Sequence, residues 1–186
     1  AGYVAVGAPS NFDYKTLSPG SGVGNGAAYI FERKRVAFGA AAVDAGADEI
    51  IVGSGAGYRA GDEVIFEIAG GTIGGLSNGN RYFVISDGKK PGVIKLASQL
   101  SDVVDANGNP LSSPKPIDLG QAGSSISAHF RRVTKLTHGI GKAGDGFGFS
   151  VALDGDQAVV GAPLRDSADN KDKEGLALAC RFKNQK

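Results

Sequence analysis

The sequence has little of the chemistry that catalysis or covalent cross-linking requires. It contains one cysteine, Cys180, so no disulfide can form within the chain. Tryptophan and methionine are absent, and there are only two histidines, His129 and His138. Neither histidine adjoins a nucleophile motif, and Ser150 lacks the closing glycine of a nucleophile elbow. We therefore predict that the chain is not an enzyme.

Charge of a single sign and long apolar runs are lacking as well. The 20 Lys and Arg residues nearly balance the 19 Asp and Glu residues, so the net charge is +1 and predicts no nucleic-acid partner. No apolar run approaches the roughly 18 residues of a membrane-spanning helix, which predicts no membrane insertion. Residues 1–4 already show a strand-like pattern without a signal peptide, so we expect a mature or excised piece of a longer protein.

Glycine is the residue in excess. Its 30 copies are roughly double the usual share of about 7%, and they lack the three-residue period of collagen. Most of them separate short runs rich in Val, Ile, Ala, Phe and Tyr, which is the pattern of short strands joined by tight turns. The fold class that we predict is all-β.

An internal repeat lies at the two ends of the chain. Residues 2–9 read Gly-Tyr-Val-Ala-Val-Gly-Ala-Pro and residues 156–163 read Asp-Gln-Ala-Val-Val-Gly-Ala-Pro. Each is a short apolar strand that ends at Gly-Ala-Pro, because proline removes a ladder donor. A polar loop follows in both copies, and then a second strand, at 28–31 and 179–182. This alignment places Cys180 where the first copy has Tyr29, and it predicts a buried, unreactive thiol.

Only the second copy has a further strand before it. Phe147, Phe149, Val151 and Leu153 alternate with small or polar residues, which predicts a half-buried strand. Asp154 and Gly155 then supply a tight hairpin turn. The repeat unit is therefore a strand, a hairpin turn, a strand that ends at Gly-Ala-Pro, a loop and a last strand.

These motifs resemble the FG-GAP repeat, the blade unit of integrin α-subunit propellers and of many bacterial surface proteins. The matching residues are Phe147-Gly148, 150–152, 159–163, Gly175 and Phe182 in the second copy, and 6–9 and 26–31 in the first. The resemblance implies blades of four antiparallel strands whose motif glycines permit tight packing near the axis. It assigns the middle two strands of one blade to the first copy, an outer strand to 132–137, and the first three strands of the next blade to the second copy. A propeller needs at least four blades, so further blades or neighbouring molecules must complete it.

The segment between the copies has a different pattern. Strands are predicted at 49–52, 63–68, 81–85 and 93–96, with two more at 117–119 and 126–130, and Gly-rich turns lie between them. The segment resembles a module that is repeated in large bacterial surface adhesins, through residues 61–64, 73–76, 82–84 and 94–97. We expect a discontinuous partial β-propeller, formed by 1–34 and 132–186, with a β-sandwich or small-barrel insert at 35–131.

Calcium is the one cofactor for which the sequence offers a candidate site. Six to eight oxygen ligands are needed, commonly from acidic residues at alternate positions of a tight loop. The candidate ligands are Asp166, Asp169, Asn170, Asp172 and Glu174. Their spacing, two intervening lysines and a glycine only at 175 depart from the regular Asp-x-Asp-x-Asp-Gly loop of the family, so a solvated blade loop is the alternative. Asp102, Asp105, Asn107 and Asn109 form a second, weaker oxygen-rich stretch.

The predicted function follows from the resemblance. It implies a non-enzymatic structural or adhesive component of a bacterial-type surface or secreted assembly, located outside the cell or on its surface. Expected partners are other proteins or copies of the chain joined by edge strands. One alternative is a carbohydrate- or protein-binding module, for example for a cell-surface glycan, with Phe12 and Tyr14 as contact residues unless they pack on the insert. A second is an accessory domain of a secreted hydrolase.

Overall fold

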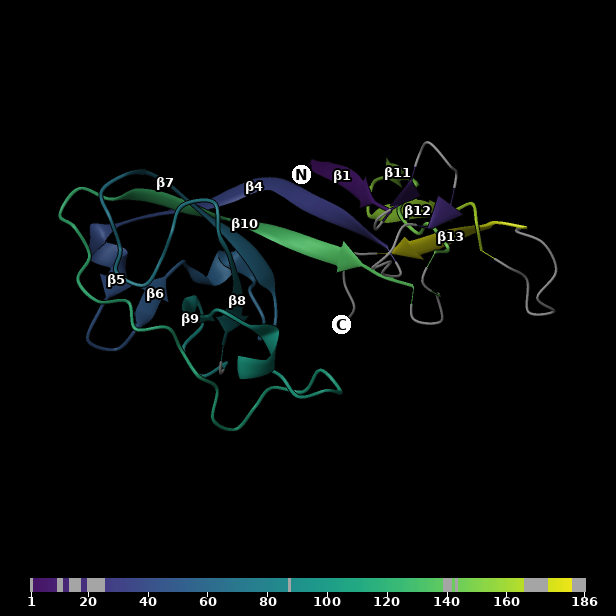
Figure 1. The fold of residues 1–186 in the computed structure, drawn as a ribbon. Coiled ribbons are helices and arrows are strands. Elements are labelled where there is room, and N and C mark those ends of the chain that lie inside the picture. The colour runs from purple at the N-terminus through teal and green to yellow at the C-terminus, as the bar shows by residue number, and fades with distance from the viewer. Residues whose placement is uncertain are drawn as a thin grey trace. The chain divides into compact units, whose positions relative to one another are not determined.

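The structure of the chain, a computed structural model, describes residues 2–9, 12–13, 18–19, 26–86, 88–138, 142, 144–165 and 174–181. This described part is all-β, as predicted, with three short 3-10 helices and no α-helix (Figure 1). None of its helices is long and apolar enough to cross a membrane. The chain divides into two compact units, one of Ala1–Arg33 with Thr134–Lys186 and one of Lys34–Val133.

The described strands form three sheets, and none of these sheets closes on itself. The largest has the order β1-β4-β10-β7-β8-β9-β6-β5, the second has the order β11-β12-β13, and β2 pairs with β3. The 3-10 helices are η1 (Ala40–Ala42), η2 (Ser54–Ala56) and η3 (Leu100–Asp102). The strands are β1 (Tyr3–Ala8), β2 (Phe12–Asp13), β3 (Ser18–Pro19), β4 (Ala27–Gly39), β5 (Val43–Asp44), β6 (Glu49–Ile51), β7 (Glu63–Gly70), β8 (Arg81–Ile85), β9 (Val93–Ala97), β10 (Ser127–Leu136), β11 (Ser150–Asp154), β12 (Gln157–Ala162) and β13 (Leu176–Arg181).

Two strands are longer than the sequence predicts. The strand expected at 28–31 continues as β4 to Gly39, and the strands expected at 126–130 and 132–137 are the single strand β10. The two are neighbours in the sheet, and each has residues in both units. The charged run 32–35 lies inside β4, because charged side chains are tolerated on a solvated strand face. The boundaries expected near 34 and 131 therefore fall within strands.

The unit Lys34–Val133 is one curled sheet around a core. From β4 to β5 its order contains six strand-to-strand steps, so a flat sheet would hold these end strands about 29 Å apart. Gly39 and Val43 are nevertheless joined by the three residues of η1, which span about 14 Å at most. The sheet must therefore bend so that its two ends approach each other. This open, curled sheet differs from the two facing sheets of the sandwich that was one of our predictions.

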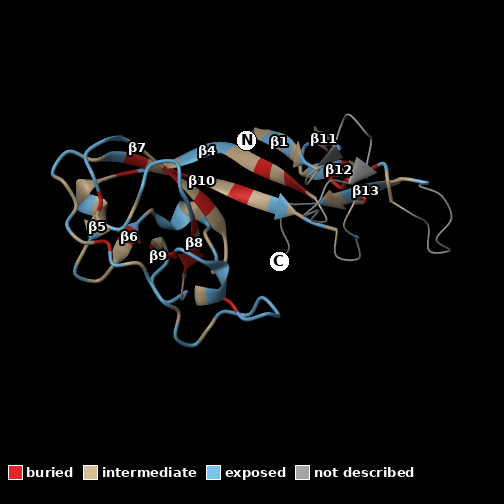
Figure 2. Cartoon of the chain, viewed as in Figure 1, coloured by how far each residue is buried: buried red, intermediate tan, exposed pale blue. Residues whose placement is uncertain are grey.

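The buried residues of this curled sheet, red in Figure 2, form a main core and a smaller cluster of Ile85, Ala97, Val103 and Val104. Phe130 is fully buried and its ring stacks on Phe38, with centroids 4.8 Å apart, while Phe66 lies tilted at 5.9 Å. The other buried members are Ile50, Val64, Ile73, Tyr82, Val84, Ile94, Leu96, Leu119 and Ala128. They include inward residues of the predicted strands 49–52, 63–68, 81–85 and 93–96, which correspond to β6, β7, β8 and β9.

The predicted strand at 117–119 is wrong. This segment pairs with no neighbour as a strand, although Ile117 donates to the carbonyl of Leu96 at 2.8 Å. Leu119 is fully buried, and its N–H donates to Asp48 Oδ1 at 3.0 Å. The apolar alternation that predicted a strand is explained by these anchors, which hold an extended segment against the core.

The other unit contains the two copies of the repeat. Repeat 1 is the pair β1 and β4 over residues 3–8 and 27–32, which are antiparallel with Gly7 opposite Ala28. Repeat 2 is the antiparallel sheet β11-β12-β13, with Gly161 opposite Ala177.

The strand predicted to start at Phe147 begins only at Ser150. Gly146 and Gly148 have φ of +71° and +91°, so the chain turns there and cannot continue a strand ladder. Because of this turn, Phe147 is 1% exposed and Phe149 is 49% exposed, instead of sharing one strand face.

Candidate functional site

The most tightly built part of the repeat unit is the contact between its two repeats. Gly26 of repeat 1 forms a parallel bridge with Phe147 of repeat 2. A Cβ on Gly7 would overlap the carbonyl oxygen of Gly148, and a Cβ on Gly26 would overlap that of Phe147. The motif glycines are therefore required by close backbone approach between the repeats.

The Phe147 side chain is buried in this contact. Its cluster contains Ala28 of repeat 1 together with Val160 and Ala162 of repeat 2, all at most 1% exposed. Partly buried apolar side chains surround it, namely Leu136, Val151, Leu176 and Leu178. A single aromatic ring thus fills the space between two small-residue strands, which is how a large side chain contributes most to packing.

Asp145 is buried in the turn that precedes Phe147. It is 5% exposed, and its Oδ2 accepts the N–H of Lys142 at 2.8 Å. Its main-chain carbonyl accepts the N–H of Leu164 at 3.2 Å. Sequence reasoning missed this residue, because an aspartate between two glycines is typical of an exposed turn. The hydrogen bonds show that it fixes the turn from within.

The register of the strands corrects the alignment of the repeats. When Gly7 is matched to Gly161, Val4 corresponds to Ala158. Val4 lies opposite Phe31 in repeat 1 and Ala158 lies opposite Cys180 in repeat 2, so Cys180 corresponds to Phe31 and not to Tyr29. The loops before the last strands differ in length, so the glycines that follow them, Gly26 and Gly175, are the better anchors. Cys180 is half-buried and burial raises the pKa of its thiol, which favours the unreactive form that we predicted.

The candidate calcium ligands lie almost entirely outside the described residues. Asp166, Asp169, Asn170 and Asp172 are not described, and Glu174 is exposed just before Gly175. Within the described residues, no three acidic, histidine or cysteine side chains gather as metal ligands would. Of the two candidate contact residues, Phe12 begins the short strand β2 without a described side chain, and Tyr14 is not described.

The weaker oxygen-rich stretch is a self-contained turn. Asp105 Oδ1 accepts the N–H groups of Asn107 and Asn109 at 2.9 and 2.8 Å, and its Oδ2 accepts from the Asn109 amide at 3.2 Å. The hydrogen bond from the backbone N–H of Asn109 is the largest of the causes that lower the pKa of Asp105. Both carboxylate oxygens thus serve the turn, as in a typical Asx turn.

The two histidines occupy different surroundings. His138 Nδ1 lies 2.8 Å from Arg165 Nη1, and its ring is 5.9 Å from that of Phe147. His129 Nε2 is hydrogen-bonded to Glu67 Oε2 on the neighbouring strand. Each histidine thus contacts a charged side chain of its own unit.

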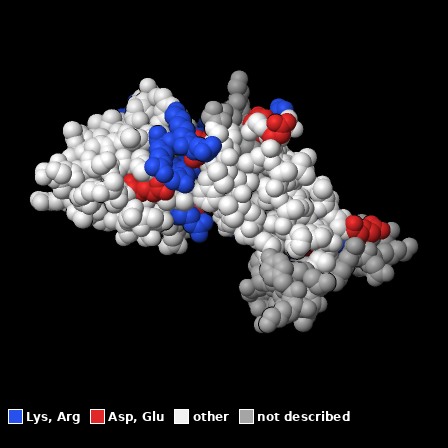
Figure 3. Space-filling model, turned by 90° about the horizontal axis from the view of Figure 1, so that it is seen from above, with Lys and Arg blue, Asp and Glu red and all other residues white. Residues whose placement is uncertain are grey.

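Glu67 is the centre of a charged cluster that sequence reasoning missed. Arg131 Nη2 donates to both of its carboxylate oxygens, at 2.8 and 3.0 Å, and Arg35 Nη2 lies 3.8 Å from Oε2. Lys and Arg side chains gather beside acidic ones on the face that Figure 3 shows. Burial alone would raise the pKa of Glu67, but the hydrogen bond from His129 and the charge of Arg131 outweigh it, and the pKa is lowered.

We expect Glu67→Gln to destabilise the chain by about 1–2 kcal/mol at neutral pH, because charge-assisted hydrogen bonds are lost. Because the pKa of Glu67 is lowered in the folded state, its carboxylate contributes fully to the free energy of unfolding at pH values above its ordinary pKa of 4.5. This contribution is lost as the pH falls through the lowered pKa of the folded protein. Urea unfolding curves of both proteins should therefore differ at pH 6 and converge near pH 3.

Glu63→Gln is the matched control for this experiment. Glu63 lies on the same strand, and its Oε1 accepts from Arg81 at 2.9 Å, but the Arg81 side chain is half exposed. A single bond to a half-exposed cation contributes less than the bonds that Glu67 accepts from His129 and Arg131, so this substitution should change stability by less than that of Glu67. A difference for Glu67→Gln that is equal at both pH values would contradict the prediction.

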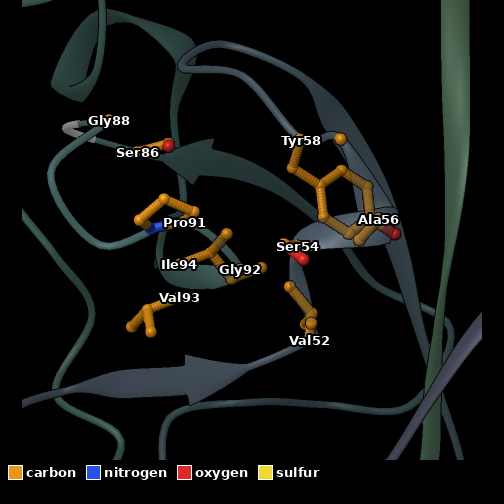
Figure 4. A pocket seen from close by; sticks show the side chains of 12 residues that line it. Val52, Ser54, Ala56, Tyr58, Ser86, Gly88, Pro91, Gly92, Val93 and Ile94 are labelled. Atoms are coloured by element: carbon orange, nitrogen blue, oxygen red, sulfur yellow. The ribbon is translucent and has the colours of Figure 1, made fainter.

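Two cavities open on the unit Lys34–Val133. The first, of about 180 Å³, lies between residues 52–58 on one side and 86–94 on the other (Figure 4). The polar side chains of its lining are those of Ser54, Ser86 and Tyr58. The second, of about 350 Å³, is lined by Lys89, Lys90 and Lys95 beside Pro114 and Pro116. Lys90 Nζ lies 2.7 Å from Glu49 Oε1. Glu49 also lines this cavity, so its lining has three lysines against one carboxylate, and the remaining positive charge favours an anionic ligand over a neutral one.

A comparison with protein-family models bears on the repeat. The FG-GAP repeat model matches residues 130–177, from β10 to the start of β13, which is about a quarter of the chain (48 of 186 residues). No curated protein and no solved structure matches the chain. The match confirms the FG-GAP resemblance for repeat 2.

An FG-GAP repeat indicates a β-rich domain of the extracellular, adhesion type, and the repeat family is generally non-enzymatic. Such repeats typically occur in extracellular or surface proteins. The complete propeller, the blade assignment of repeat 1 and the adhesin-like character of the insert stay predictions.

Proposed function

We propose that the chain is a non-enzymatic structural or adhesive part of an extracellular or cell-surface assembly, in which FG-GAP repeats form propeller blades and residues 34–133 form an inserted domain. The observation that carries this proposal is the fit of Phe147 and Gly148 against Gly7 and Gly26, which uses the motif residues of both repeats. The family match at 130–177 supports it independently.

The location can be tested on intact cells of the source organism. An antibody against the 186-residue chain should label unpermeabilised cells or the culture medium, and brief protease treatment of intact cells should remove the cell-bound signal. A protein that stays protected until the cells are broken would contradict an extracellular role. An antibody against a cytoplasmic protein of the same cells controls for leakage.

Calcium binding by the loop before Gly175 is part of the proposal. The carboxylates at Asp166, Asp169, Asp172 and Glu174 supply oxygen ligands, and extracellular calcium modules bind with dissociation constants of about 10⁻⁴–10⁻³ M. Titration calorimetry should show calcium binding that Asp169→Ala with Asp172→Ala abolishes. Asp105→Ala should leave binding unchanged, because its carboxylate serves a separate turn. Equal heats from the double variant and the original chain would exclude this site.

A second candidate function rests on the basic cavity of the insert. Its lining contains Lys89, Lys90 and Lys95 against the single carboxylate of Glu49, and this excess of positive charge favours a carbohydrate-binding module for an acidic saccharide. A glycan array should show binding to uronate- or sialate-bearing glycans that Lys95→Glu removes and that Lys34→Glu, a matched change outside the cavity lining, retains. Binding to neutral glycans alone would reject this candidate.

A further inference from the structure

The two repeats of the unit share the same strand pairing, but each exposes a different one of its two faces. Matching Gly7 to Gly161 and Ala28 to Ala177 through the strand pairings also matches Val4 to Ala158, Val6 to Val160 and Ile30 to Ala179. Side chains directly opposite in an antiparallel pair point to one side of the sheet. Each repeat therefore has two faces, which can be compared position by position.

We call one of them the receiving face. In repeat 1 it contains Gly7, Ala28 and Ile30, and in repeat 2 it contains Gly161, Ala177 and Ala179, with Val159 beside them. Repeat 2 covers this face in repeat 1, where Ala28 and Ile30 are at most 1% exposed. The equivalent residues of repeat 2, Ala177 and Ala179, are exposed, and Val159 is 44% exposed.

We call the opposite face the covering face. In repeat 2 it contains Ala158, Val160 and Ala162, which are at most 1% exposed because they lie against repeat 1. In repeat 1 the equivalent residues are Val4, Val6 and Ala8. Val4 is 49% exposed, Val6 is 50% exposed, and Ala8 is exposed. The chain thus holds one receiving face and one covering face that are apolar and that nothing in the described residues covers.

The uncovered faces are the two halves of an interface that already exists within the chain. The centres of both faces consist of small and β-branched apolar side chains, and polar side chains border the receiving face of repeat 2, with Ser150 opposite Gly161 and Gln157 opposite Arg181. Gly161 and Gly175 repeat the receiving glycines Gly7 and Gly26. Gly175 also has the same backbone conformation as Gly26, with φ of +71° against +77°. An unlike pair of faces on one molecule produces head-to-tail contacts between copies rather than a two-fold dimer.

We propose that a second copy of this chain places the covering face of its repeat 1, centred on Val4 and Val6, on the receiving face of repeat 2, centred on Val159, Ala177 and Ala179. This inference rests on the proposed function, and it identifies the protein partner in the assembly as a second copy of the chain. Face-to-face stacking of repeats, and not only pairing of edge strands, then joins the copies.

Light scattering after size-exclusion chromatography tests the proposal, with the 186-residue chain loaded from about 10 to about 500 μM. The mass should rise above the monomer value of 18.9 kDa as concentration increases. Val159→Glu and Val6→Lys should each remain monomeric, because each destroys one face of the pair. Both residues are about half exposed, so circular dichroism and thermal unfolding should show an intact fold.

Mixing the two variants makes the test specific for head-to-tail stacking. The Val159→Glu chain keeps its covering face and the Val6→Lys chain keeps its receiving face, so a 1:1 mixture should associate at least to dimers, although each variant alone is a monomer. Leu100→Glu is the matched control, since Leu100 is also 44% exposed but lies on η3 of the other unit. It should associate as the original chain does.

Four results would overturn the proposal: a monomer at every concentration, association that survives in Val159→Glu, a mixture that stays monomeric, or equal loss in Leu100→Glu. If the chain stays monomeric, a second copy of residues 130–181 can be joined after it. A higher unfolding temperature of this fusion would show that a further repeat of the same polypeptide, and not a second chain, covers the receiving face. Location at the cell surface is measured separately. A surface protein that does not stack loses only this inference, and a stacking protein inside the cell loses only the proposed function.

Discussion

Gly148→Ala should lower the free energy of unfolding of the repeat unit by about 4 kcal/mol. Gly148 has φ of +91°, which a side chain disfavours, and a Cβ there would overlap the carbonyl oxygen of Ala27. Backbone strain of about 1–3 kcal/mol adds to a similar cost for forcing atoms into a packed contact. Chemical denaturation, followed by hydrogen exchange of the peptides that contain β11 and β12, measures the loss and locates it.

Two further glycine variants separate the causes. Gly7→Ala adds only the steric conflict, because Gly7 has no positive φ and its Cβ would meet the carbonyl of Gly148; about 3 kcal/mol is expected. Gly155→Ala adds only backbone strain, since φ is +58° and no atom lies within 4 Å of its Cβ; about 1 kcal/mol is expected. If Gly155→Ala cost as much as Gly7→Ala, close packing of the repeats would not be the reason for the motif glycines.

Phe147→Ala should cost about 3–5 kcal/mol, whereas Phe149→Ala, two residues away, should change stability by less than about 1 kcal/mol. Phe147 is 1% exposed at the contact between the repeats, and Phe149 is 49% exposed beyond the turn at Gly148. Thermal unfolding of the two variants and the original chain provides the comparison. Similar losses for both phenylalanines would show that they share a buried face, as in our original interpretation of the sequence.

The alternation of apolar residues predicted most of the strands of the insert, because period two is a direct consequence of strand geometry. Val64 and Phe66 in β7 and Ile94 and Leu96 in β9 are buried as that pattern requires. The same rule failed at Phe149, where positive φ angles at Gly146 and Gly148 change the direction of the chain. A glycine in the sequence permits such an angle but does not reveal that it is adopted.

In the candidate sites, the contacts between residues that are far apart in the sequence could not be predicted from the sequence. Glu67 and His129 are 62 residues apart, and they meet only because β7 and β10 are neighbours in that register. A shift of one residue would move each side chain to the other face. The alignment of Cys180 with Tyr29 failed for a related reason, because loops of different length hid the register that Gly26 and Gly175 define.

The side-by-side position of β4 and β10 has a consequence for the entropy of folding. Phe38 and Phe130 stack within the unit Lys34–Val133, so this unit holds together the two strands through which the chain enters and leaves it. Closing a flexible loop of about 100 residues would otherwise cost about 4 kcal/mol of chain entropy. The core of the unit offsets that cost, so β10 can pair beside β4 although the rest of the unit separates them in the sequence. A segment with a core of its own shortens, in effect, the polypeptide that the repeats must organise.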